Sequence, residues 1–478
     1  MKFTGVDLSD ATDALYVNGG VNGNGSEGTR NIDKGKMDTY AAVNNVVITA
    51  ENSKFYLLGV GGSGSTKVGS GSVVLTDCEV DTLFLSGING EVETSSITMN
   101  SCKIEDFAAT NRGFVGIGSV EINNSTVDNL NTGASEGCFQ SDSGLKDGSG
   151  VTGSVTYDID ANSTITNAVL TPTVKRDSGI YEASFINVSI SKDGEPLNLS
   201  VKGFQPASNT VTDFTVPEGS TLKLDNVNAE IAEKQSVTNA GIIDVATSTL
   251  TVPDGATLAN AGDIIGEVTG SFTECAVRVG SKGYTNLSSA MADLQDGDTI
   301  TLLKDVEVDG TGKTNNQGVI TIEKNITLDG NGKTLSVKNV TPDASDNEKR
   351  ASVLNVQGGA SVTVRDLVID ATGAKHGINI NSATVKVEDV TISNGIGYGI
   401  VCNSSNVTVD GLITSGNAWG GINVDTNTNA NSTVTINDAN VTENASIVFE
   451  NGISGTTTTT TINGGSFQTI KEQGENTE

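Results

Sequence analysis

Hydrophobic and polar residues alternate in short segments that recur along the chain with nearly constant spacing. Four such segments begin at Ser361, Thr384, Asn406 and Thr433. Each has two apolar positions flanking one polar residue, then two polar or turn-forming residues, then two more apolar or small positions around a spacer. Alternation with a period of two is typical of β-strands, and a fixed repeat of this length is typical of solenoids. The pattern predicts stacked coils of short parallel strands.

Four further segments, at 73–80, 97–104, 120–127 and 460–467, follow the same rule. With the first apolar residue numbered zero, positions 0, 2, 5 and 7 are expected to face the core. Position 1 is expected to face solvent. Position 4 is expected to bend the strand, because it holds residues that tolerate a tight or left-handed turn. Those residues are Asp77, Ser101, Asn124, Asp366, Asp389, Gly411, Asp438 and Gly464.

The repeats occupy two regions of the chain. We expect a first β-solenoid at 1–172, a Pro-containing all-β connecting segment at 173–275, and a second β-helix at 276–478. The connecting segment is interpreted either as distorted solenoid coils or as a small β-sandwich packed alongside. Asn286 and Gly297 are start and stop signals for a short α-helix at 287–295. This helix is expected to cap the open end of the second solenoid.

Composition supports a slender protein with an acidic surface. The chain has 57 Gly, 12 Phe, 7 Tyr and 1 Trp, and its formal net charge is −30. This charge argues against nucleic acid or an anionic membrane as a partner, because both attract basic patches. No apolar run is long enough to insert into a membrane, and residues 1–10 contain no hydrophobic signal core. An exported protein would therefore carry its signal and anchor outside this sequence.

The coil pattern resembles the right-handed parallel β-helix, or pectin-lyase-like, domains of bacterial extracellular surface proteins and adhesins. The segments 284–306 and 326–335 resemble the start of such domains. The resemblance implies an all-β, right-handed parallel β-helix in a secreted or cell-surface protein. It concerns a fold and not one activity.

Three aromatic residues occupy corresponding places on consecutive coils of the second solenoid. They are His376, Tyr398 and Trp419, each just before a Gly-Ile or Gly-Gly-Ile sequence. Stacked aromatic and imidazole rings suit sugar rings, whose C–H-rich faces pack on π surfaces. The alternative is that these residues only cover a corner of the coil. We treat the three as a candidate ligand-binding site.

Catalytic chemistry is weakly represented. Polygalacturonases of this fold use close Asp residues with Gly-His-Gly and Arg-x-Lys motifs. Here residues 375–377 match the first motif only in part, and Arg365 does not begin the second. Asp366, Asp389 and Asp410 line up on consecutive coils, but a bend explains acids near that position. No residue is therefore assigned a catalytic role.

The sequence evidence for a metal site or a reactive thiol is equally weak. The pairs Asp158/Asp160 and Asp296/Asp298 offer oxygen ligands for calcium without a known calcium-loop pattern, so no cofactor is expected. Cysteines occur at 78, 102, 138, 275 and 402, without metal-ligand spacing. Cys78 and Cys102 share one position on consecutive coils. They form either a disulfide or a column of buried thiols.

The sequence favours a non-catalytic extracellular adhesin or surface module that binds a glycan or a host or neighbouring-cell surface protein. A polysaccharide lyase or glycoside hydrolase of the β-helix type is the alternative. A structural stalk is the third hypothesis.

Overall fold

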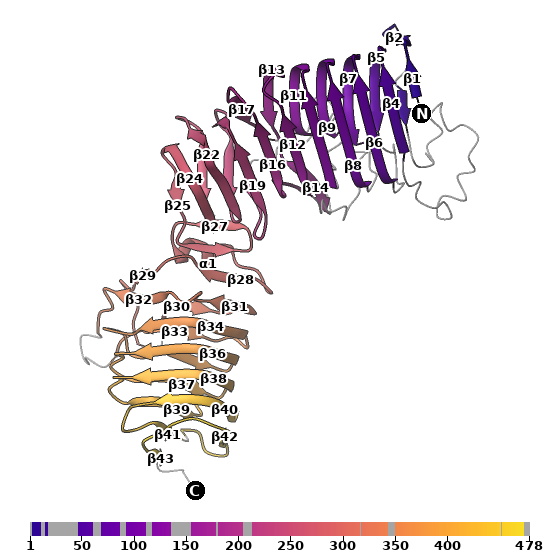
Figure 1. Ribbon diagram of the computed structural model, residues 1–478. Helices are drawn as coiled ribbons and strands as arrows, with labels where there is room; N and C mark the ends of the chain where they lie inside the picture. Colours follow the sequence, from indigo (N-terminus) through magenta and orange to yellow (C-terminus); the bar gives the residue numbers. More distant parts are fainter. Residues whose placement is uncertain are drawn as a thin grey trace. The chain divides into compact units, whose positions relative to one another are not determined.

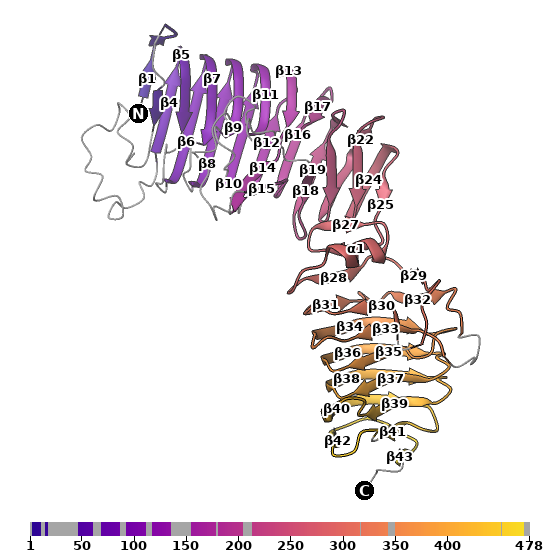
Figure 2. The same ribbon diagram turned by 180° about the vertical axis from the view of Figure 1, so that it is seen from behind.

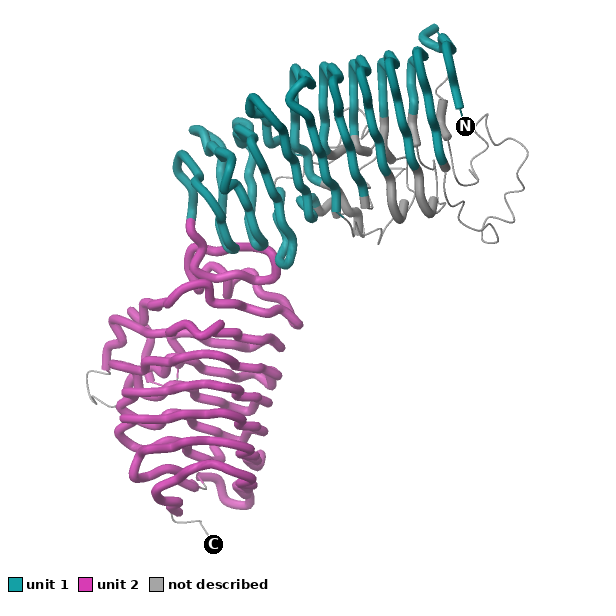
Figure 3. Tube along the Cα trace, in the orientation of Figure 1, with its two compact units in different colours: residues 1–273 teal, residues 274–478 magenta. Residues whose placement is uncertain are grey.

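The computed structural model divides into two compact units, Met1–Thr273 and Glu274–Glu478 (Figure 3). The structure describes residues 2–10, 15–17, 46–60, 68–86, 92–110, 117–134, 154–177, 180–203, 213–315, 317–342, 349–450 and 452–472.

Unit 1 is built around one long sheet of parallel strands stacked coil on coil (Figure 1). Strands of neighbouring coils pair in register, for example Val120 with both Ile97 and Tyr157. The sheet contains β1 (Lys2–Thr4), β2 (Asp7–Leu8), β3 (Leu15–Val17), β4 (Val46–Glu51), β5 (Lys54–Val60), β6 (Val68–Thr76), β7 (Glu79–Ser86), β8 (Val92–Asn100), β9 (Lys103–Thr110), β10 (Ile117–Asn123), β11 (Thr126–Ala134), β12 (Val155–Ile159), β13 (Thr164–Leu170), β16 (Val188–Lys192), β17 (Leu197–Val201), β19 (Thr221–Asp225), β20 (Val227–Ile231), β22 (Ile242–Val252) and β24 (Asp263–Gly270).

The segment at 173–275 contributes strands to the same long sheet. In it β16 pairs in parallel with β12, and β17 pairs in parallel with β13. A second, smaller sheet of unit 1 begins with an antiparallel hairpin of β14 and β15. Its strands are β14 (Thr173–Asp177), β15 (Ile180–Ser184), β18 (Asp213–Val216), β21 (Ser236–Asn239), β23 (Thr257–Asn260) and β25 (Thr273–Glu274).

Unit 2 has two sheets, which are parallel except for antiparallel pairing at the start of the longer one (Figure 2). The longer sheet contains β26 (Val277–Val279), β27 (Lys282–Tyr284), β28 (Thr299–Leu302), β29 (Val306–Asp309), β31 (Ile326–Asp329), β32 (Thr334–Lys338), β34 (Ser361–Asp370), β36 (Thr384–Ser393), β38 (Asn406–Ser415), β40 (Ser432–Val441) and β42 (Thr458–Ile462). The other contains β30 (Gly318–Ile322), β33 (Ser352–Val356), β35 (Ile378–Asn381), β37 (Tyr398–Asn403), β39 (Gly420–Asp425), β41 (Ile447–Phe449) and β43 (Ile470–Glu472).

The predicted inward positions form the cores of both units. In β34, β36, β38 and β40, positions 0, 2, 5 and 7 are at most 2% exposed. Residues at position 1, such as Glu121 and Lys386, remain accessible. The C-terminal segment is an exception, because Ile462 is 39% exposed on the last described coil. Stacked aliphatic columns therefore hold the coils together, and each coil covers its neighbour.

Six of the eight predicted bends have a left-handed backbone, whereas Asp438 and Gly464 do not. Asp77, Ser101, Asn124, Asp366 and Asp389 have φ between 48° and 54°. Non-glycine residues rarely adopt this left-handed region, and Asp and Asn tolerate it best. The bend rule read from the sequence thus reflects backbone sterics.

One short helix begins unit 2. Helix α1 spans Leu287–Asp293, and the Asn286 side chain caps it by accepting a hydrogen bond from the Ser289 N–H at 2.8 Å. Leu287, Ala290 and Leu294 are buried against the first strands of the unit. The expected fold class, an all-β parallel solenoid with one short helix near 287–295, is confirmed.

Candidate functional site

The outward face of the shorter unit-2 sheet carries the predicted site. Ile378, Ile400, Ile422 and Ile447 stack in register and face the main core. Because side chains alternate along a strand, residues next to these isoleucines face outward. Strands β37 and β39 are nevertheless almost completely buried. Their outward side chains therefore pack against one another instead of standing in solvent.

His376 lies two residues before β35 and is 7% exposed. Its Nδ1 accepts a hydrogen bond from the Tyr398 N–H at 2.8 Å, so the neutral ring carries its proton on Nε2. Burial, with a smaller contribution from the charge of Lys375, lowers the pKa of His376 to about 3. His376 is therefore neutral at physiological pH and positions its neighbours.

The structure brings the three predicted residues into one cluster, here called the aromatic triad (His376, Tyr398 and Trp419). The His376 and Tyr398 rings are nearly parallel, with centroids 5.9 Å apart. Trp419 presents its ring edge-on to both, at 5.8 Å from His376 and 5.6 Å from Tyr398. Such edge-to-face contacts are favourable for aromatic rings. Trp419 is only half-buried, so it supplies most of the accessible aromatic surface.

Trp419 lies one position outside the column that the sequence suggested. Tyr398 pairs with Gly420, because the extra glycine before Ile422 shifts the tryptophan by one residue. Gly420 has φ 153°, and a Cβ there would lie 2.3 Å from the Ala445 carbonyl oxygen. A glycine is thus required beside Tyr398, and the displaced Trp419 ring closes the side of the cluster.

A pocket of about 500 Å³ opens beside the aromatic triad. Two outward columns of mainly polar residues line it, and here they are called the amide columns. Successive coils are joined through the amides, for example Asn379 Nδ2 to Asn355 Oδ1 at 3.0 Å and Asn403 Nδ2 to Asn381 Oδ1 at 3.2 Å. The lining members of the columns are Asn379, Val401 and Asn423 in one, and Gln357, Asn381, Asn403, Asp425 and Glu450 in the other.

Two carboxylates lie at one end of the pocket. Asp425 and Glu450 follow residues that pair in register on β39 and β41. Burial, followed by the negative charge of Asp425, raises the pKa of Glu450. The Tyr398 hydroxyl donates to Glu450 Oε1 at 3.5 Å, and burial raises the pKa of Tyr398. The pocket therefore joins an aromatic wall to an acidic end.

The cation of Lys375 lies beside the aromatic triad. Lys375 Nζ is 5.3 Å from the centroid of the Trp419 ring and 3.1 Å from Asn315 Oδ1. The first distance is within the range of cation–π attraction. This contact holds Trp419 in its edge-on orientation and leaves the pocket with groups of both charges.

No protein-family model, curated protein or solved structure matches the chain.

Other residues singled out in the sequence lie at strand bends or are buried, or lie outside the described residues. Asp366 and Asp389 bend strands of the other unit-2 sheet and do not line the pocket. Cys78, Cys102, Cys275 and Cys402 are buried free thiols, whereas Cys138 lies outside the described residues. Within the described ranges, no group of three or more His, Cys, Asp or Glu residues is arranged to hold a metal ion. No helix in the described part of the chain is long and apolar enough to cross a membrane.

Sequence reasoning missed the amide columns and the acidic end of the pocket. Asn381, Asn403 and Asp425 each lie three residues after a buried isoleucine of the stacked column. This recurrence was visible, but it falls outside the apolar rule by which the repeats were aligned. Glu450 has the same spacing after Ile447, but its coil is longer, so the column was harder to read from the sequence at this point.

Proposed function

We propose that this chain is a non-catalytic module that binds a glycan through the unit-2 pocket. We also propose that it belongs to the secreted or cell-surface proteins with a right-handed, pectin-lyase-like β-helix. One observation carries the proposal: the aromatic triad adjoins a pocket of about 500 Å³ lined by amide and carboxylate side chains. This volume is typical of small-ligand sites.

Sugar chemistry fits these groups. The C–H-rich face of a sugar ring packs on an aromatic surface, which the half-buried Trp419 offers. Amide side chains such as Asn403 and Asn423 both donate and accept hydrogen bonds, as sugar hydroxyls do. The net charge of −30 disfavours nucleic acid, whose binding depends on cationic contacts with phosphates.

The test is a glycan array on the full chain, followed by titration calorimetry on each hit. Trp419→Ala is expected to weaken binding at least tenfold, which is about 1.4 kcal/mol. Tyr398→Phe should have a smaller effect, because it removes only the hydroxyl. Tyr56→Ala is the matched control, since Tyr56 is an exposed aromatic residue of unit 1. Circular dichroism confirms that each variant folds.

A chain that binds no glycan, or binds one equally well as Trp419→Ala, would refute the proposed site. Binding to purified cell-surface proteins without glycan binding would favour a protein ligand instead.

Glycoside hydrolysis is the second candidate, because Asp425 and Glu450 lie together in the pocket. Hydrolysis needs one protonated and one ionised carboxyl group, and burial beside Asp425 raises the pKa of Glu450 as a general acid requires. Every glycan hit is therefore incubated with the chain and examined for shorter products. Product that disappears with Glu450→Gln would establish the enzyme and replace the non-catalytic proposal.

A further inference from the structure

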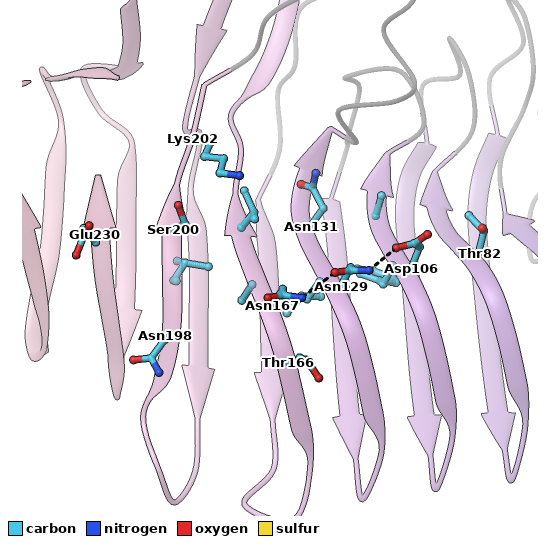
Figure 4. Close-up of a pocket in the computed structure, with 16 residues that line it drawn as sticks. Thr82, Asp106, Asn129, Asn131, Thr166, Asn167, Asn198, Ser200, Lys202 and Glu230 are labelled. Atoms are coloured by element: carbon cyan, nitrogen blue, oxygen red, sulfur yellow. Dashed lines mark hydrogen bonds between the residues drawn. The ribbon is translucent and has the colours of Figure 1, made fainter. Parts of the chain in front are cut away.

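A second, larger groove lies on unit 1. It has a volume of about 840 Å³ and follows the outward face of β7, β9, β11, β13, β17 and β20. Ala108, Val169 and Ser200 line it with short side chains, and longer polar side chains from successive coils flank them (Figure 4). With coils about 4.8 Å apart, the groove extends about 24 Å from the coil of Thr82 to that of Glu230.

A ladder of polar side chains runs along this groove. Asn167 Nδ2 donates to Asn129 Oδ1 at 3.0 Å, and Asn129 Nδ2 donates to Asp106 Oδ1 at 2.8 Å (Figure 4). On later coils, Asn228 Nδ2 donates to Asn198 Oδ1 at 3.3 Å. The donors point in one direction, so each amide has a fixed orientation and the lining presents an ordered array of donors and acceptors.

This ladder contributes little to the stability of the fold. Asp106, Asn129 and Asn167 are exposed, and a hydrogen bond between exposed groups replaces bonds to water with small net gain. The core beneath is already filled by Phe107, Leu130 and neighbouring apolar residues. The ladder is therefore not required for packing, and its position in the groove makes its amides accessible to a ligand.

The geometry also restricts the class of ligand. Strand β11 is paired in parallel on both sides, with β9 and β13, so its backbone is not available to add a peptide strand. Recognition must use side chains. Three charged residues line the groove, Asp106, Lys202 and Glu230, and they leave one net negative charge. With a chain charge of −30, an anionic polymer would be repelled.

We propose that this groove binds an extended, neutral polysaccharide chain laid across the coils of unit 1. Hydroxyl groups recur along such a chain and match amides that recur along the ladder. The elongated groove selects a polymer, whereas the unit-2 pocket is compact. This site does not depend on the function proposed for unit 2.

Affinity electrophoresis of the full chain in gels containing xyloglucan, galactomannan, mixed-linkage β-glucan or dextran tests the proposal. The double variant Asn129→Ala/Asn167→Ala is expected to lose about tenfold in affinity for the retained polymer. The double variant Asn437→Ala/Asn463→Ala is the control, because it removes another exposed cross-coil amide pair, at 2.9 Å, outside both pockets. Short oligosaccharides of the same polymer should compete poorly.

Retention by a neutral polymer that is lost only in the Asn129/Asn167 variant supports the groove. Retention lost instead in Trp419→Ala assigns the polymer to unit 2 and overturns this inference while leaving the proposed function in place. Absence of retention, equal retention of all variants, or retention only by a charged polymer such as chitosan also overturns it.

Discussion

A buried carboxylate in unit 2 allows the packing argument to be tested quantitatively. Thr414 occupies an inward position between Ile392 and Val441 and is fully buried. Its hydroxyl donates to Glu443 Oε2 at 2.7 Å. Asn417 donates to Glu443 Oε1 from its backbone N–H at 3.2 Å and from its side chain at 2.6 Å. One carboxylate thus accepts hydrogen bonds from Thr414, the polar residue of an otherwise aliphatic column, and from Asn417.

Glu443→Ala removes the acceptor of these donors. The Asn417 amide retains the Ile392 carbonyl oxygen at 3.3 Å, but the Thr414 hydroxyl and the Asn417 backbone N–H lose the acceptor they have in Glu443. Each unpaired buried donor costs about 1–3 kcal/mol. Because Glu443 is 8% exposed and water reaches the vacated space, we expect a loss of about 3 kcal/mol in the free energy of unfolding of unit 2.

Urea unfolding followed by tryptophan fluorescence measures this loss, because the single tryptophan, Trp419, reports on unit 2. With a slope of about 2 kcal/mol per molar urea, the midpoint should fall by about 1.5 M. Glu307→Ala is the control, since Glu307 forms an exposed ion pair with Lys338 at 2.7 Å. Its effect should be far smaller.

Equal midpoints for the Glu443 and Glu307 variants would refute the reasoning. In a double-mutant cycle with Thr414→Val, the coupling between Thr414 and Glu443 should exceed about 0.5 kcal/mol. A coupling of zero would mean that the hydroxyl and the carboxylate act independently.

Two further predictions concern the protonation of His376 and the strand bend at Asp366. The pKa of His376 is lowered from 6.5 to about 3 on folding, so the unfolded chain binds its proton more readily. Stability should therefore fall by about 2 kcal/mol between pH 6.5 and 5, and His376→Asn should remove most of that slope in urea titrations; an unchanged slope contradicts a neutral His376. Asp366 has φ 49°, so Asp366→Val should lower the melting temperature, with a cost of about 1–2 kcal/mol, whereas Asp366→Gly should be nearly neutral; equal effects contradict backbone strain.

The parallel coils could be predicted from the sequence because burial imposes strict alternation. Val387 and Val409 pair in register and are fully buried, so a polar residue at either position would be costly. The outward residues that alternate with them along each strand are free to vary. The apolar columns are therefore the strongest sequence signal of the coils. The bends were visible for a related reason, since few residues tolerate a left-handed backbone.

The site was only partly predictable. The repeat length brought His376 and Tyr398 onto neighbouring coils, and their rings do stack. The offset of Trp419 depends on Gly420, a single inserted residue whose consequence is steric. Glu450 joins the pocket through a coil of different length. Local insertions of this kind change which residues meet without changing the apolar pattern.

The unit-1 ladder escaped detection for the same reason. Asn129 and Asn167 form adjacent rungs although 38 residues separate them, whereas Asp106 and Asn129 are separated by only 23. The longer spacing between Asn129 and Asn167 hides the repeat in the sequence, but the parallel register restores it in space.

In-register stacking turns one sequence position into a column that runs across many coils. Inward columns are constrained by packing, and their residues need no other explanation. Outward polar columns are not required by the apolar core, so an ordered outward column is more informative than any single residue within it. The amide columns of unit 2 and the ladder of unit 1 are such columns, and both line hollows on the surface.

Binding in this protein is therefore expected to be distributed over several coils. Each single substitution in a ladder should weaken binding by a small step, whereas loss of Trp419 should weaken binding at the unit-2 pocket at least tenfold.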